Sequence, residues 1–586
     1  PQNPNEPLQK GEDRKEEHFP LPLPRTSSLS STPPPPAYSP AIAASPMSPT
    51  TAAAYYPLPA MASELPVWAY SAPGAPEAQT LPVFLAPPPP PALPAGYRMP
   101  PPPPPCPLAF RVPSSLLFQM DYRRSHSLVQ FLRDEGAVPT PEEDMTREQV
   151  IRKLKKIVMD WAKQVGHEQR VPPRRVTATV LTYGSYTLGA HGPESDIDAL
   201  CVGPCIATLP HHFFVVLRQI LQRRPEVSGV QSVENAKVPL MRFIFSGISV
   251  DLTYAQLPVI DAVQAINSSS PQFLRKLDSR SWRSLSGVRV NEQIVQLVPD
   301  AEKFQVLLRC IKLWARRRGL HCHLLGFFAG IHLAILAAYI CQKYPKATVN
   351  GLFTMFFEIF AHWHWQIPVD LHGQPSKCRL SDGCLMPIVM PCTPPELCAS
   401  NMTESTFGKI REELMRGYAL TKDLWKHDFE WTWLFEPFPY VTKYDQFLRI
   451  ALCAPTSEEL SDWAGWVKSR FRYLILKLEG DGIVCDPDPS PEVDHSVTMP
   501  NTVYYWGLVP QTNGYLDINS LKEDFMKGVV NDVYGKVKCT HSELTMSIVG
   551  SSELPKSMYG DSFYSQHLPR YMVGYQAATD CWSAVG

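Results

Sequence analysis

Three aspartates on stretches typical of β-strands are the residues whose spacing points to chemistry. Asp196 and Asp198 are separated by one residue, and Asp251 lies in a later run of alternating apolar and polar residues. Side chains alternate between the two faces of a strand, so Asp196 and Asp198 share one face. Carboxylate oxygens suit Mg²⁺ or Mn²⁺, and a third carboxylate from a neighbouring strand would complete a site for two ions. Such a site can hold an attacking hydroxyl and a transferring phosphate together.

A glycine and a serine end the predicted strand that precedes this pair. Gly184 and Ser185 follow the β-branched run at 176–183. Glycine lets a triphosphate approach the backbone closely, and the serine hydroxyl can bond a phosphate oxygen. An Asp-x-Asp pair alone is common and usually caps a turn. Together with the Gly-Ser pair and the later aspartate, it favours a metal site that faces a phosphate-binding loop.

Helices and strands alternate in the segment that carries the aspartates, which indicates an α/β or α+β module. Order is expected to begin with a helix capped by Thr140, whose apolar residues recur at helical spacing through 150–161. A hairpin is predicted at 241–254 around a Ser246-Gly247 turn. On its second strand Asp251 faces away from the apolar residues, as a metal ligand must.

The rest of the chain divides into a helical region and a second α+β unit. Residues 257–440 are mostly helical in pattern, and the helix at 302–318 carries Arg309, Lys312 and Arg316 along one face. The later unit is predicted to have strands at 447–452, 501–509 and 544–549 and helices at 460–478 and 520–530. That order indicates an RRM-like, ferredoxin-like sandwich.

Composition limits the number of domains and the kinds of partner and metal site that the chain can have. The chain has 586 residues, 44% of them apolar, enough for about three or four domains. A net charge of -1 gives no global basic field, so a nucleic-acid partner needs a local positive patch. The 14 cysteines form no paired CxxC motif, which favours reduced thiols. His321, Cys322 and His323 have no partner cluster that would make them a metal site.

Two segments have unusual composition. Residues 1–107 are rich in proline, alanine, serine and threonine, which favours disorder and polyproline II; a solvated spacer and a ligand for SH3-like or WW-like domains both stay open. Residues 324–341 are apolar over a length that could cross a membrane. Because this run contains His332 and lies between soluble-looking modules, a buried helix is the favoured interpretation and no membrane partner is expected.

Beyond these patterns, the chain after the proline-rich arm resembles eukaryotic, plant-like poly(A) polymerases. These belong to the nucleotidyltransferase superfamily of DNA polymerase beta. The resemblance rests on successive blocks that include "YGSYTLGAHGPESDIDALCVGP", "VPLMRFIFSGISVDLTYA", "RSLSGVRVNEQIVQLVP", "LLRCIKLWARRRGL", "LLGFFAGIHLAILAAYICQKYP" and "YYWGLVP". It implies an α+β multidomain fold: a disordered arm at 1–107, a nucleotidyltransferase catalytic domain at 108–256, a helical middle domain at 257–440, an RRM-like RNA-binding domain at 441–560 and a tail at 561–586.

The same resemblance implies a reaction and a set of site residues. AMP from ATP would be added to RNA 3′ ends without a template, releasing pyrophosphate. Asp196, Asp198 and Asp251 match the ligands of two Mg²⁺ or Mn²⁺ ions, with Asp251 nearest the attacking hydroxyl. The implied ATP contacts are Tyr183, Gly184, Ser185, Lys312, Arg316, His321, Gly330 and Ile331.

Several positions depart from the family pattern. Ser286 replaces the asparagine of "SLNG", Arg316 the lysine of "KLWAKR", and His321 and His323 the tyrosine and asparagine of "YSN". The family's "GGVSWA" is changed at 329–334. A neutral imidazole still donates one hydrogen bond but lacks the reach of a phenol, so an active enzyme with a weaker or altered nucleotide grip is expected.

Two alternatives remain open at this stage. One is a transferase that adds uridine or CCA, and the other is an RNA-binding paralogue with a decayed nucleotide site. The resemblance implies a monomer that binds the RNA 3′ end and ATP, with a cleavage and polyadenylation complex as a further partner. It implies a nuclear location; a cytoplasmic one stays open because the Ser/Lys-rich tail of nuclear members does not follow the RRM-like unit.

Overall fold

A computed structural model describes residues 114–559 except 235, 266–274, 374–382, 393, 423–428, 512–515, 532–534 and 538–539. The predicted proline-rich arm at 1–107 and the tail at 561–586 lie outside the described residues. Strands and helices both contribute substantially, which confirms the α+β class.

A five-stranded sheet carries the aspartates. Its strands are β1 (Thr179–Tyr183), β2 (Ile197–Gly203), β3 (Val227–Val233), β4 (Leu240–Phe245) and β5 (Ile248–Gln256), in the spatial order β1-β2-β5-β4-β3. β2 and β5 pair in parallel, whereas all other neighbours are antiparallel. The predicted hairpin is confirmed: Phe245 pairs with Ile248, and Ser246 and Gly247 both have positive φ, as a tight two-residue turn requires.

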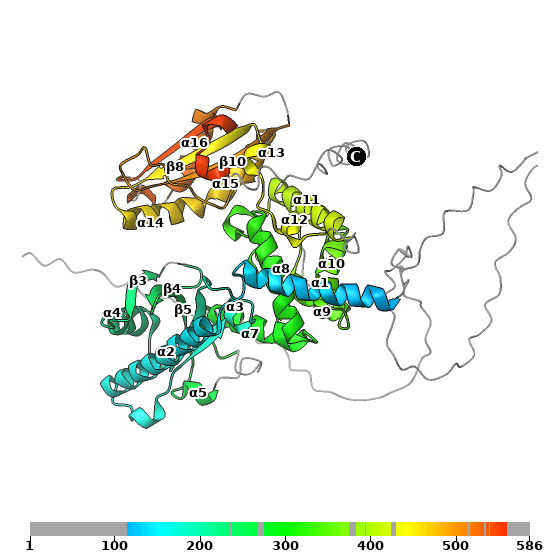
Figure 1. The fold of residues 1–586 in the computed structure, drawn as a ribbon. Coiled ribbons are helices and arrows are strands. Elements are labelled where there is room, and N and C mark those ends of the chain that lie inside the picture. Colours follow the sequence, from blue (N-terminus) through cyan, green and yellow to red (C-terminus); the bar gives the residue numbers. More distant parts are fainter. Residues whose placement is uncertain are drawn as a thin grey trace, which may run out of the picture. The chain divides into compact units, whose positions relative to one another are not determined.

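Short and long helices accompany this sheet. They are α2 (Pro141–Glu168), α3 (Gly184–Thr187), α4 (Arg218–Gln222) and α5 (Ala262–Ala265). Thr140 and Glu143 form the predicted capping box of α2, which runs alongside the sheet in Figure 1. Trp161 of α2 is 1% exposed and meets Tyr254 of β5 edge-on, so the apolar face predicted for this helix is in the core.

Helices dominate the region that follows, as the sequence pattern predicts. They are α7 (Ser279–Leu297), α8 (Ala301–Arg317), α9 (Gly330–Lys343), α10 (Val349–Ala361), α11 (Glu404–Thr421), α12 (Trp431–Phe435) and α13 (Tyr440–Lys443), with a small hairpin of β6 (Val389–Met390) and β7 (Glu396–Leu397). The apolar run at 324–341 is not one helix. Gly326 interrupts it, since its φ of +86 is not helical. A Cβ at this position would lie 2.9 Å from the Asn401 carbonyl oxygen, which explains why the residue is a glycine. None of the helices within the described ranges is long and apolar enough to cross a membrane.

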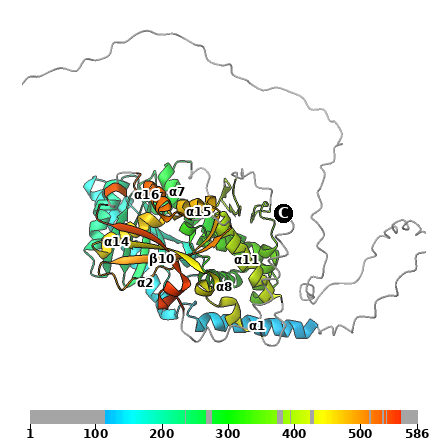
Figure 2. The same cartoon turned by 90° about the horizontal axis from the view of Figure 1, so that it is seen from above.

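One helix was not anticipated. α1 (Ser114–Asp134) precedes the residue at which order was expected to begin, and both views show it beside α8 (Figure 1, Figure 2). The Asp121 carboxylate accepts hydrogen bonds from the Thr348 hydroxyl and the Asn350 amide, each at 2.6 Å. The helix is therefore held by residues more than two hundred positions away, which a local pattern cannot reveal.

A second sheet lies in the C-terminal part of the chain. β8 (Gln446–Cys453), β9 (Ile483–Pro487), β10 (Asn501–Pro510) and β11 (Glu543–Gly550) form an antiparallel sheet in the order β11-β8-β10-β9, with α14 (Ser457–Lys468), α15 (Phe471–Gly480) and α16 (Ile518–Val529) between them in sequence. The single helix predicted at 460–478 is two helices. The Ser469 hydroxyl bonds the Trp466 carbonyl at 2.6 Å, and such a local bond competes with continuation of the helix.

Candidate active site

The parallel pairing of β2 and β5 places two of the three aspartates side by side. Asp198 is the register partner of Asp251, and Asp196 directly precedes β2. Ile197 is 0% exposed in the core, so the predicted alternation holds for this strand. Asp251 is buried, Asp198 is half-buried and Asp196 is exposed, which makes the group a partly open patch at the strand ends.

Electrostatics indicates that the three carboxylates share one space. Burial raises the pKa of Asp198 to about 7, and the negative charges of Asp196 and Asp251 add to this effect. Burial also raises the pKa of Asp196, again with a contribution from Asp251. Like charges resist joint ionisation when they are close and poorly solvated, so this patch favours a positive partner.

Arg242 is a neighbour that the sequence patterns did not single out. It lies on β4 opposite Asp251, and its Nε and Nη2 donate to the Asp251 carboxylate at 2.7 and 2.6 Å. The register of the hairpin could have identified it, because the Ser246-Gly247 turn fixes which residues face each other. Within the described ranges no three His, Cys, Asp or Glu side chains are grouped as a metal-ligand set.

The donor chemistry nevertheless fits a hard divalent cation. Asp196 and Asp198 disfavour each other's charge, and the Asp251 carboxylate lies on the adjacent strand. A dication would relieve this repulsion and accept carboxylate oxygens as ligands. The three carboxylates are therefore of the ligand type that a hard divalent cation takes.

The junction of β1 and α3, at Tyr183 and Gly184, lies against this patch. Gly184 has φ +67, and a Cβ there would come 1.9 Å from Asp198 Oδ2. The glycine therefore makes room for the Asp198 carboxylate, a reason that differs from the close approach of a phosphate expected from the sequence. Tyr183 precedes it and packs against Gly287 of α7, and burial raises its pKa to about 12. Ser185 is half-buried in the first turn of α3.

Positive groups approach the patch from α8. Lys312 Nζ donates to the Ala190 carbonyl at 3.1 Å. Its pKa is lowered to about 8 by burial and by Arg316, while Asp196 and Asp198 oppose that shift. Lys312 is therefore within electrostatic range of both the aspartates and Arg316.

His321 belongs to the same electrostatic neighbourhood. Burial lowers its pKa to about 4, and the charges of Lys312 and Arg316 lower it further. The imidazole is thus neutral near pH 7 and has one N–H donor and one acceptor. The Ser286 hydroxyl donates to the Arg283 carbonyl at 2.7 Å within α7.

Gly330 and Ile331 form the first turn of α9, a helix that contacts α3. A Cβ on Gly330 would meet nothing within 4 Å, so open space lies beside this turn. Ile331 is half-buried and packs on the large apolar core. These two predicted contacts therefore lie on a helix start that adjoins α3.

Arg147 supports the loop that leads into the aspartates. It is 2% exposed, and its Nη2 donates to the carbonyls of Gly192, Pro193 and Ser195 at 3.2, 2.5 and 2.8 Å. No sequence motif singles out this arginine, because its partners are bare carbonyls on a distant loop. It fixes the backbone immediately before Asp196.

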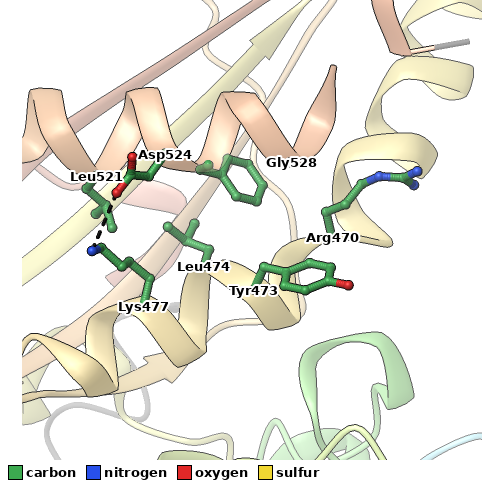
Figure 3. A pocket seen from close by; sticks show the side chains of 8 residues that line it. Arg470, Tyr473, Leu474, Lys477, Leu521, Asp524 and Gly528 are labelled. Carbon is green, nitrogen blue, oxygen red and sulfur yellow. Dashed lines mark ion pairs between the residues drawn. The ribbon is translucent and has the colours of Figure 1, made fainter. Parts of the chain in front are cut away.

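A cavity of about 220 Å³ lies elsewhere, between α15 and α16. Figure 3 shows Tyr473 and Leu474 on one side of it and Leu521 on the other, with Lys477 paired to Asp524 at 3.4 Å. None of its lining residues is a predicted catalytic or ATP-binding residue. The predicted site residues therefore lie on the first sheet and in the helical region, away from this cavity.

Comparison with known proteins identifies the family. Residues 117–298 match the poly(A) polymerase nucleotidyltransferase domain, and residues 303–437 match the poly(A) polymerase central domain. Nuclear poly(A) polymerase 3 of Arabidopsis thaliana is 44% identical over 486 residues, which cover 78% of this chain and 95% of that protein.

Two relatives with lower sequence identity are also poly(A) polymerases. Nuclear poly(A) polymerase 2 of Arabidopsis thaliana is 36% identical over 66% of this chain, and the poly(A) polymerase of Dictyostelium discoideum is 36% identical over 63%. The matched segments span 51% and 46% of those two proteins. With two domains matched in order and 95% of one relative covered, the chain belongs to the poly(A) polymerase family of nucleotidyltransferases.

Proposed function

We propose that this protein adds AMP from ATP to RNA 3′ ends without a template. The observation that carries the proposal is the pairing of Asp198 with Asp251 on parallel strands, with Lys312 in electrostatic range, in a chain that belongs to this family. In the reaction, the RNA 3′ oxygen forms a bond to the α-phosphorus of ATP. The bond to the β-phosphate oxygen breaks, and pyrophosphate leaves.

Asp196, Asp198 and Asp251 would hold two Mg²⁺ or Mn²⁺ ions. When bound, such ions neutralise the charge on a transferring phosphate and orient the reacting groups. The chain's own residues do the rest. Lys312 donates to the triphosphate, Arg316 adds a planar cation beside it, and the first turn of α9 presents Gly330 and Ile331 to the nucleotide.

His321 gives this site a weaker grip than the family's tyrosine. A neutral imidazole in that place offers one donor without the reach of a phenol. Loss of one such contact costs about 1–3 kcal/mol, or about 5- to 150-fold in affinity if nothing compensates. The expected consequence is a raised KM for ATP with turnover largely retained.

The order of elements in the C-terminal part supports an RRM-like RNA-binding domain. Four strands and intervening helices follow as β8, α14 and α15, β9, β10, α16 and β11, with the sheet order expected of a ferredoxin-like sandwich. RNA would be held by phosphate contacts and base stacking. We assign the domain limits 108–256, 257–440 and 441–560, noting that α1 contacts α8 and α10.

Location and further partners follow from the same assignment. Four relatives are named nuclear poly(A) polymerases, which supports a nuclear location for this chain. A cleavage and polyadenylation complex and proteins that bind proline motifs are the proposed partners, the latter through the proline-rich residues 1–107.

Primer extension tests the proposal. An RNA primer is incubated with the protein, Mg²⁺ or Mn²⁺ and each nucleoside triphosphate separately. Extension with ATP alone is expected. Preferred extension with UTP or CTP would instead favour the second candidate, a transferase whose base choice is altered by His321. RNA binding without extension would favour an RNA-binding protein with a decayed nucleotide site. Asp198→Ala should abolish extension and leave RNA affinity unchanged.

A further inference from the structure

His332 occupies a position where the family pattern has a small residue, and its ring reaches a carbonyl that a small side chain cannot reach. It is the third residue of α9 and 2% exposed. Its Nδ1 accepts the backbone N–H of Ala329 at 3.1 Å, and its Nε2 lies 3.1 Å from the Ala399 carbonyl oxygen. The first contact satisfies the N–H that precedes the helix, and the second reaches the segment after β7.

The two contacts require one particular form of the ring. Nδ1 must be an acceptor and Nε2 must carry the proton, since a carbonyl can only accept. Burial lowers the pKa of His332 to about 4, and the nearby His323 lowers it further, so the ring is neutral near pH 7. A neutral ring has one acceptor and one donor, which is what these partners need.

His323 holds the same segment from the other side. Its Nε2 lies 3.1 Å from the same Ala399 carbonyl oxygen, and the Asn401 amide donates to the His323 carbonyl at 3.2 Å. The segment at 399–401 is therefore tied to both ends of the stretch that runs from His323 to the start of α9. That stretch includes the turn on which Gly330 and Ile331 lie.

We propose that His332 is a positioning residue for the nucleotide, which ties the first turn of α9 to the Ala399 carbonyl so that Gly330 and Ile331 present a fixed wall. This inference rests on the proposed function, which places ATP against that turn. The competing explanation is that His332 only fills the core. An apolar side chain of similar size would then serve as well.

Three variants of the full chain separate these explanations. His332→Leu keeps the volume and removes both hydrogen bonds. His332→Gln can accept from Ala329 N–H and donate to the Ala399 carbonyl, as glutamine does at this position in a capping box. His495→Ala removes an exposed histidine elsewhere and serves as the matched control.

Steady-state extension should separate KM from kcat. For His332→Leu the KM for ATP is expected to rise about 5- to 30-fold, with kcat and the KM for RNA within about twofold, because fixed ground-state contacts are lost. His332→Gln should recover to within about threefold of wild type, and His495→Ala should not differ from it.

Two results would overturn the positioning role of His332. A His332→Leu protein with lower thermal stability but an unchanged KM for ATP would overturn the proposal, as would a His332→Gln protein as impaired as His332→Leu. If His332→Leu fails to fold, His332→Asn replaces it, because asparagine can still accept from Ala329 N–H but is too short to reach the Ala399 carbonyl. MgATP binding by each variant is also measured by calorimetry. If the wild type binds ATP but does not extend RNA, the proposed function is refuted, and the affinities of the variants for MgATP still test the positioning role of His332.

Discussion

Replacing Asp198 by asparagine should stabilise the metal-free protein while abolishing its activity. The charged carboxylate is half-buried beside Asp196 and Asp251, and its pKa is raised from 3.8 to about 7. Asparagine keeps the shape and removes the charge. A residue that the fold tolerates only at a cost is expected to be retained for chemistry.

The magnitude follows from the raised pKa. At about 1.36 kcal/mol for each pH unit, a rise from 3.8 to about 7 corresponds to about 4 kcal/mol of unfavourable free energy in the ionised fold. Residual solvent at this half-buried group reduces that figure, so about 2 kcal/mol is the expected gain. Because the folded pKa exceeds the unfolded one, the penalty is complete above pH 7 and disappears as the pH falls toward 4.

Denaturation by urea at pH 8 and at pH 5, without and with Mg²⁺, measures the effect. The gain in the free energy of unfolding for Asp198→Asn should be larger at pH 8 than at pH 5. Added Mg²⁺ should stabilise the wild type more than the variant, since only the wild type keeps the full ligand set. Asp160→Asn on the exposed side of α2 is the control and should change little.

The reasoning is refuted if Asp198→Asn is no more stable than wild type at pH 8 in the absence of divalent ions. A gain of the same size at both pH values would also contradict it, because charge repulsion must vanish on protonation.

Three further predictions concern residues around the site and between the domains. Arg147→Met should lower the free energy of unfolding by about 2–3 kcal/mol and reduce kcat, because the loop before Asp196 loses its three carbonyl contacts. Arg152→Met, on the same helix, is the control and should change neither quantity. Urea denaturation measures the stability of each variant, and primer extension measures its kcat. Lys409→Met should cost about 3–5 kcal/mol, since it leaves Asp486 of β9 buried without its cation, and the double variant Lys409→Met with Asp486→Leu should recover part of this loss in the same measurement. Between pH 7 and pH 5 the free energy of unfolding of the wild type should fall by about 1–2 kcal/mol more than that of His321→Gln. Over this range the imidazole becomes protonated in the unfolded chain, whereas the buried ring of the folded protein, with its pKa near 4, stays neutral.

Local patterns predicted much of the first sheet and its site. The alternation around Asp198 and Asp251 predicts their faces, and the Ser246-Gly247 turn predicts the hairpin, because both depend on neighbours in sequence. The parallel pairing that sets Asp198 opposite Asp251 joins strands about fifty residues apart, and periodicity alone does not specify it. The family resemblance implied only that Asp196, Asp198 and Asp251 act together as metal ligands.

Other features depend on long-range contacts and escaped sequence reasoning. Arg147 meets only backbone carbonyls, so no residue type in its target loop announces the interaction. α1 is held by Thr348 and Asn350 of a distant helix start. The short strand β9 contains Asp486 and ends in Pro487, residue types that disfavour strands, and it forms because β10 pairs with it.

The crowding of carboxylates also bears on whether the site is still used. An RNA-binding protein with a decayed nucleotide site would gain stability by losing Asp196 or Asp198, since burial and the neighbouring carboxylates disfavour the charge of each. Arg242 offsets only part of this repulsion, because its two hydrogen bonds go to Asp251. A chain that keeps all three aspartates, together with Gly184 to make room for Asp198, keeps an arrangement that pure RNA binding does not need. The physical cost of the site therefore argues for catalysis and against a scaffold role.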